Sequence, residues 1–145
     1  MDSVKINTGE KQISINDDPT RVIVFNPNGR LFIDKFYNLI HELQEKSREF
    51  EKREADLLKS SEVDEFGAPV NFQEVINLQK EVCVYLRERI DHVFGNGTSQ
   101  TVFGDSLNPD AIAQFLEGVT PFITKARQSK INDFSNFKTN RRVMK

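Results

Sequence analysis

The chain has 145 residues, enough for about one domain, of which 37% are apolar and 29% charged, with a formal net charge of −2. This balance is typical of a folded globular protein and excludes a chain that is disordered throughout. The first 20 residues hold no apolar stretch resembling a signal peptide, and no run approaches the ~20 residues that span a bilayer. We therefore expect neither secretion nor membrane insertion. Cys83 is the only cysteine, which rules out an internal disulfide and favours a reducing compartment such as the cytoplasm.

The N-terminal segment alternates apolar and polar side chains in short runs. These runs cover residues 4–6, 13–15 and 21–25, and the last is rich in β-branched side chains. Turn residues at 7–10 predict a β-hairpin that joins the first two runs. We expect a small three-stranded β-meander over residues 1–25, with an open edge that could accept a strand from another chain.

Two long amphipathic helices are expected to follow. Asn26-Pro27 is a suitable helix start, and apolar residues then recur at spacings of three, four and seven. Gly and Pro at residues 60–69 interrupt this period and predict a loop. The second helix is expected to begin at Asn71, where Glu74 three places on resembles a capping box, and to end at Gly95. The economical packing is an antiparallel helical hairpin.

The remainder is expected to form a shorter pair of helices. Residues 98–105 are polar with a small apolar pair and predict a loop or a short ordered turn. Asn108-Pro109 repeats the helix-start signal. Pro121 should break or kink the helix that begins there, with helical structure continuing to about residue 131.

The predicted fold is therefore mostly α within the α+β class. A single domain would span residues 1–132, divided into a small sheet (1–25) and a helical part (26–132). Residues 133–145 would form a basic flexible tail. Seven basic residues and one acid lie between Lys125 and Lys145, a local charge of +6 that leaves −8 for the rest of the chain.

Candidate catalytic groups are isolated from one another. His41 and His92 lie on different helices, and the nearest acid at metal spacing, Glu45, is a pair that a glutamate-rich helix produces by chance. Cys83 lies about two and a half turns from His92 on the same helix, too far for a nucleophile and its base. We expect no enzymatic activity, no cofactor and no metal site.

The basic tail makes nucleic acid a rival partner. Its cations could neutralise phosphates, and two nearby phenylalanines could stack on bases. Against this, the acidic body would repel a nucleic acid, and the chain has no recognised binding motif, so we rank nucleic acid behind protein. The cations concerned are Lys138, Arg141, Arg142 and Lys145.

Four segments carry a family resemblance that covers nearly the whole chain: residues 15–27, Phe36-Tyr37, residues 93–105 and residues 120–127. Together they resemble a small protein family from tailed phages and prophages of Gram-positive bacteria, which in turn is similar to the tail assembly chaperones. The resemblance implies a β-containing N-terminus with a helical remainder. It also implies a role in the host cytoplasm, coating the tape measure protein before the tail tube polymerises around it. It supplies no catalytic residues.

The leading hypothesis is thus a chaperone that binds tape measure or tail tube chains during tail assembly, and copies could also add to one another. A second hypothesis is a structural component of the tail or head–tail junction, and a third is a nucleic-acid-binding regulator. Candidate contact residues lie on the exposed half of the first long helix, around Phe50, and in the expected loop 97–105. They are Phe50, Leu57, Thr98, Ser99, Gln100 and Phe103. The alternatives are that Phe50 is buried within the hairpin and that the segment only covers the core.

Overall fold

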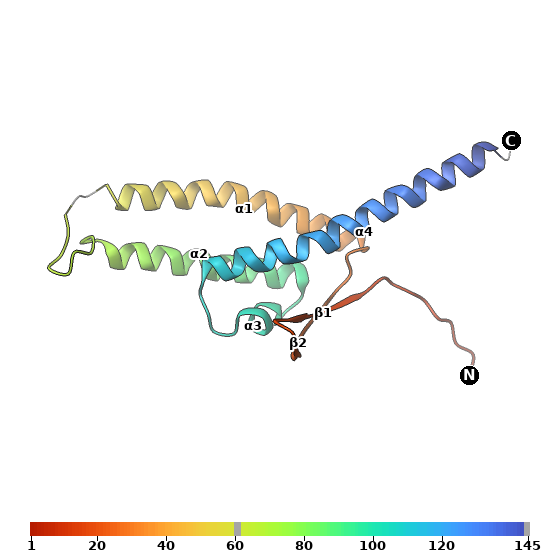
Figure 1. The fold of residues 1–145 in the computed structure, drawn as a ribbon, viewed down its shortest axis with the longest axis horizontal. Helices are drawn as coiled ribbons and strands as arrows, with labels where there is room; N and C mark the ends of the chain where they lie inside the picture. The colour runs from red at the N-terminus through yellow and green to blue at the C-terminus, as the bar shows by residue number, and fades with distance from the viewer. Residues whose placement is uncertain (60–61, 144–145) are drawn as a thin grey trace.

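The computed structural model describes the backbone of residues 1–59 and 62–143 and the side chains of residues 1–59 and 62–128. The fold is α+β and mostly helical, with a small antiparallel sheet followed by helices, as predicted (Figure 1). Its elements in chain order are β1 (Lys11–Ile15), β2 (Asp18–Phe25), α1 (Arg30–Leu57), α2 (Phe72–Phe94), α3 (Thr98–Phe103) and α4 (Pro109–Val143).

The sheet has two strands in the described part of the chain, and the expected three-stranded meander is wrong. Residues 1–10 form no strand, and the hairpin turns at Asn16 and Asp17, whose φ angles of 54° and 58° suit a tight turn of the mirror-image type. The predicted turn at residues 7–10 does bend locally, because the Gly9 amide donates to Asn7 Oδ1 at 3.0 Å. It does not bring the preceding residues back onto β1.

The pairing of the two strands is irregular near their turn. Ser14 lies opposite Val22, whereas Ile15 lies opposite Asp18. Residues 19–21 of β2 therefore have no partner on β1, which is a bulge. The bulge contains Arg21, whose Nε donates to the Thr101 carbonyl of α3 at 3.0 Å and whose Nη2 donates to the next carbonyl.

The core is centred on the ring of Phe94 at the end of α2. Its ring centroid lies 5.4 Å from that of Phe25, 5.2 Å from Phe32, 6.2 Å from Phe36 and 5.3 Å from Phe115. These partners come from β2, α1 and α4, so one aromatic side chain joins the sheet to three helices. Edge-to-face and tilted pairs of this kind add to the stabilisation from burial.

The antiparallel α1–α2 hairpin is confirmed, with differences at its helix starts. α1 begins at Arg30 because Asn26 Oδ1 accepts a hydrogen bond from the Asn28 amide at 3.0 Å, which forms a local turn before the helix. Asn71 precedes α2 but makes no side-chain cap bond; its Nδ2 instead donates to the Leu57 carbonyl across the loop. The predicted stop at Gly95 is confirmed, with a φ of 119° that favours glycine.

Two expectations for the C-terminal third are corrected. Residues 98–103 form the short helix α3, bounded by Gly97 and Gly104, both with positive φ. The helix starting at Pro109 continues without a break through Pro121. Packing explains this continuity, because Val119 and Ile123 on either side of the proline are fully or almost fully buried.

α4 extends to Val143 and projects past the rest of the molecule (Figure 1). A tail was expected from about residue 133, but the backbone there is helical as far as the structure describes it. Whether the segment is flexible stays a prediction. The side chains of Lys138, Arg141 and Arg142, and all of Lys145, lie outside the described residues.

Candidate protein-binding surfaces

The α1–α2 hairpin is closed at one end and open at the other. The buried residues of α1 are Phe32, Phe36 and Leu39, all in its first three turns. Beyond them the two helices extend away from the sheet and α3 (Figure 1). The apolar stripe of the second half of α1 therefore lies at the surface of a two-helix layer.

A groove of about 220 Å³ lies between the helices in this part of the hairpin. Its apolar lining comes from Leu43 and Phe50 of α1, Val82 and Leu86 of α2 and Pro109 of α4, and charged side chains that include Lys46 and Glu54 border it. We call this surface the hairpin groove. An apolar floor with a charged border suits a side chain or short helix from another protein.

Phe50 is half-buried in the hairpin groove. The Arg53 guanidinium lies 5.5 Å from the centroid of its ring, and the same guanidinium forms two hydrogen bonds to Glu81 of α2, at 3.1 and 3.3 Å. The ring is therefore neither a fully buried core residue nor a freely exposed one. Leu57 is also half-buried but does not line the groove; it lies at the loop end of α1.

The other predicted contact residues differ in how far they are buried. Thr98 and Ser99 are buried and bonded within the chain: Thr98 Oγ1 donates to the Gly95 carbonyl at 2.8 Å, and Ser99 Oγ donates to the Arg87 carbonyl at 2.7 Å. In this conformation they tie α3 to α2, which fits the alternative that the segment covers the core. Gln100 is exposed and Phe103 half-buried, so these two are accessible.

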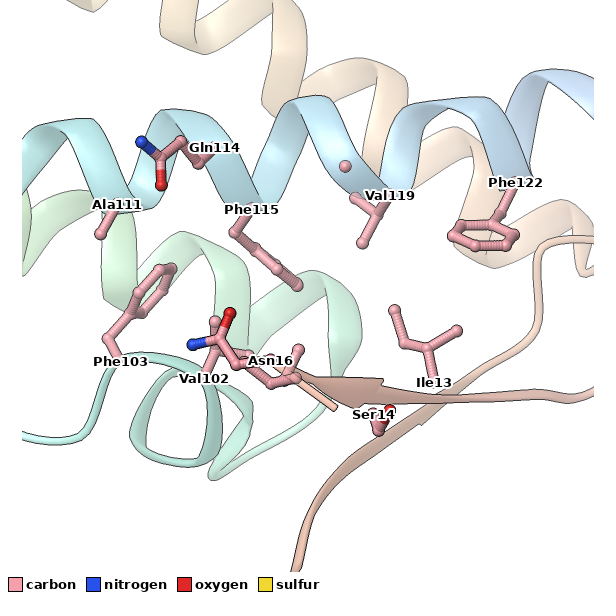
Figure 2. Close-up of a pocket in the computed structure, with 12 residues that line it drawn as sticks. Ile13, Ser14, Asn16, Val102, Phe103, Ala111, Gln114, Phe115, Val119 and Phe122 are labelled. Carbon is pink, nitrogen blue, oxygen red and sulfur yellow. The ribbon is translucent and has the colours of Figure 1, made fainter. Parts of the chain in front are cut away.

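A second hollow, of about 340 Å³, lies between β1, α3 and α4, and sequence reasoning missed it (Figure 2). Figure 2 shows Ile13 of β1 pointing toward Val119 and Phe122 of α4, with Phe103 of α3 at the other end. We call it the β1–α4 cavity. The sequence signal that could have indicated it is Gly118, which leaves space on α4 beside large apolar residues.

The side chains that could react or bind a metal lie apart from one another in the structure. Cys83 is fully buried, and burial raises the pKa of its thiol although the nearby Arg87 charge opposes the shift. His41 Nε2 lies 3.4 Å from Glu45 Oε1 on an exposed helix face. Among the described residues, no three His, Cys, Asp or Glu side chains gather where they could hold a metal ion. None of the helices, as far as they are described, is long and apolar enough to cross a membrane.

Comparison with known proteins gives one match. A family model described as a family of unknown function, DUF6673, matches residues 22–145, which covers the end of β2 and helices α1 to α4. No curated protein matches, and no solved structure matches. The chain therefore belongs to DUF6673, a family of unknown function.

Proposed function

We propose that this protein is a non-enzymatic assembly factor that holds an amphipathic helix of another protein in the hairpin groove. The observation that supports this most is the apolar surface around Phe50, left uncovered in the outer part of a hairpin whose other end is well packed. A helix that binds such a groove inserts apolar side chains at i, i+3 or i+4, and i+7. The charged border would then set the orientation of the client.

The resemblance to tail assembly chaperones suggests the client. A tape measure protein is long and helical, so it would offer repeated amphipathic surfaces to many copies of a small chaperone. Tail tube subunits are the second expected partner. On this proposal the protein acts in the host cytoplasm, before the tail tube polymerises, and releases its client afterwards.

The experiment is co-expression with the products of the flanking genes, followed by pull-down and then by binding measurements with the captured protein. Recovery of a long helical tape measure protein is the expected result. Phe50→Glu should weaken that binding at least about tenfold while leaving the fold intact, because it places a charge on the apolar floor of the groove. Ala55→Glu is the matched control, since Ala55 is exposed on the same helix and does not line the groove.

Different outcomes separate the alternatives. If Phe50→Glu unfolds the protein, Phe50 belongs to the core and the groove is not a docking surface. If binding is unchanged, the client binds elsewhere. Mass spectrometry of purified phage particles tests the role itself: abundant copies in the particle would indicate a structural component of the tail or head–tail junction. We expect no retardation of DNA even at low salt, and a shift that requires residues 133–145 would favour the nucleic-acid-binding regulator.

A further inference from the structure

The first residues of the chain form an extended arm that leaves the body (Figure 1). We call residues 1–7 the N-terminal arm. Besides Met1 it has two apolar side chains, Val4 and Ile6, which are 84% and 77% exposed. They are separated by one residue, so in an extended conformation both point to the same side. An alternating pair of this kind is typical of a strand with one face buried, yet nothing in the described part of the molecule covers it.

The base of the arm is fixed to the body by two asparagines. Asn26 Nδ2 donates to the Thr8 carbonyl at 2.5 Å, and Asn28 Nδ2 donates to the Gly9 carbonyl at 3.2 Å. To pair with β1 of the same chain, the arm would have to reverse its direction near Thr8 and Gly9. The two hydrogen bonds fix the backbone at that point. Position 9 requires glycine, because its φ is +80° and a Cβ there would lie 2.5 Å from Asn28 Nδ2. The arm is thus directed away from its own sheet.

The sheet has an edge that could receive such an arm. β1 pairs with β2 on one side, while α3 packs against β2. In the described residues, β1 makes no backbone hydrogen bond to any other element. A strand at the edge of a sheet presents unpaired N–H and C=O groups, which another extended segment can bind.

The β1–α4 cavity adjoins this edge. Its lining includes three consecutive residues of β1, Ile13 to Ile15, and Asn16 of the turn that follows. Neighbouring side chains of a strand point to opposite faces of the sheet. Because consecutive residues of β1 line the cavity, the cavity borders the edge of the strand as well as the face that points toward α4. A strand added here would have a polar edge on one side and the apolar face of α4, with Val119 and Phe122, above it.

From these features we propose that the N-terminal arm of one copy adds as a third strand to β1 of a second copy and places Val4 and Ile6 in its β1–α4 cavity. The occupant has the required pattern: two apolar side chains on one face and a backbone free to pair. An arm that is directed away from its own cavity meets the same surface on another copy. If the exchange is reciprocal it gives a closed dimer, and if it is not, it gives a ring or a longer chain of copies. The inference does not depend on the client proposed for the hairpin groove.

The first test changes the arm. Light scattering should give a mass above that of one chain for the native protein, rising with concentration. Val4→Glu with Ile6→Glu should reduce the mass to one chain, because both charges would enter the cavity. Ser3→Glu with Lys5→Gln is the matched control: it changes the net charge by the same amount at positions on the other face of the strand, and it should associate as the native protein does.

The second test fills the cavity from the other side. Gly118 lines it, and a Cβ at this position meets no atom within 4 Å. Gly118→Leu should therefore block the cavity while keeping the fold, since leucine favours a helix more than glycine does. Gly118→Ala is the control and should still associate, because a methyl group leaves most of the space open. A labelled peptide of residues 1–8 should bind saturably to the Val4→Glu, Ile6→Glu protein and lose at least about tenfold in affinity when Gly118→Leu is added.

Three results would overturn the proposal. One is a native protein that has the mass of a single chain at every concentration. Another is unchanged association after Val4→Glu with Ile6→Glu. The third is that the peptide of residues 1–8 binds the Val4→Glu, Ile6→Glu protein but does not bind a native protein that is monomeric. That result would mean that the arm of each chain occupies the cavity of the same chain.

Discussion

The two ends of the α1–α2 hairpin are stabilised in different ways. At the end near the sheet, Phe94 contacts rings from β2, α1 and α4, and Ile90 is fully buried. Toward the loop end Pro109 of α4 reaches the hairpin groove, and the cross-links of the hairpin are polar, such as Arg53 with Glu81 and Asn71 with the Leu57 carbonyl. Helices supported by a core at one end can therefore leave an apolar surface uncovered at the other.

The largest difference should appear when a ring is removed at each end. Phe94→Ala should lower the free energy of unfolding by about 3–5 kcal/mol, because it leaves a cavity among four other rings. Phe50→Ala should cost less than about 2 kcal/mol, since the ring is already half in water. Urea unfolding followed by circular dichroism measures both. Equal costs would mean that the loop end is as well packed as the end near the sheet.

The next effect concerns the attachment of α3 to the sheet. Arg21→Ala removes a charged donor from two carbonyls at the end of α3 and should cost about 1–3 kcal/mol. Hydrogen exchange should increase in residues 98–103 and stay unchanged near Phe50. Arg21→Lys should recover only part of the loss, because an ammonium cannot match both carbonyls as a guanidinium does. If exchange rises equally along the whole hairpin, the contact supports the fold globally.

A smaller effect should depend on pH through Cys83. Burial raises the pKa of its thiol in the folded state. The folded protein therefore keeps this proton at pH values where the unfolded chain has lost it, and stability falls as the pH rises above about 8.5. Cys83→Ala should lose less stability than the native protein between pH 7 and pH 9.5. The native thiol should also react slowly with a thiol reagent at pH 7.5, and fast labelling without unfolding would show that the core opens there.

The smallest effect is expected for the ion pair at the loop end. Arg53 and Glu81 have side chains that are 46% and 55% exposed, and such pairs contribute between about 0 and 1 kcal/mol. A double-mutant cycle with Arg53→Ala and Glu81→Ala measures the coupling, which should weaken in high salt. A coupling well above this range would show that the two helices are joined there more rigidly than their exposure suggests.

The helices whose apolar residues recur at a regular spacing were predictable from the sequence. Features that depend on contacts between residues far apart in the chain were not. α1 and α2 follow from apolar spacing, and the end of α2 follows from Gly95, because these are local effects. Helix α4 continues through Pro121 because the packing of Val119 and Ile123 outweighs the local cost of the proline. The run at residues 4–6 has the pattern of a strand, but no strand forms there, since its pairing partner is not supplied by the local sequence.

The candidate sites also differ in whether local sequence was enough to predict them. Thr98 and Ser99 were predicted contacts as part of a loop, which the polar sequence had indicated. Both are buried instead: Thr98 bonds to the turn before α3 and Ser99 to a carbonyl of α2. Polarity cannot distinguish a side chain that faces water from one that satisfies buried backbone groups. The β1–α4 cavity was missed because its walls come from three elements that lie far apart in the chain.

Local propensity and the spacing of apolar residues are enough to predict the class of the fold, the two long amphipathic helices and their antiparallel pairing. Which apolar stripes are covered depends on contacts between elements that lie far apart in the chain. Phe36 and Phe50 both fall on the apolar stripe of α1, but Phe36 is 2% exposed and Phe50 lines an open groove. Burial needs another layer: Phe36 belongs to the core cluster that β2 and α4 complete, whereas of α4 only Pro109 lines the groove at Phe50.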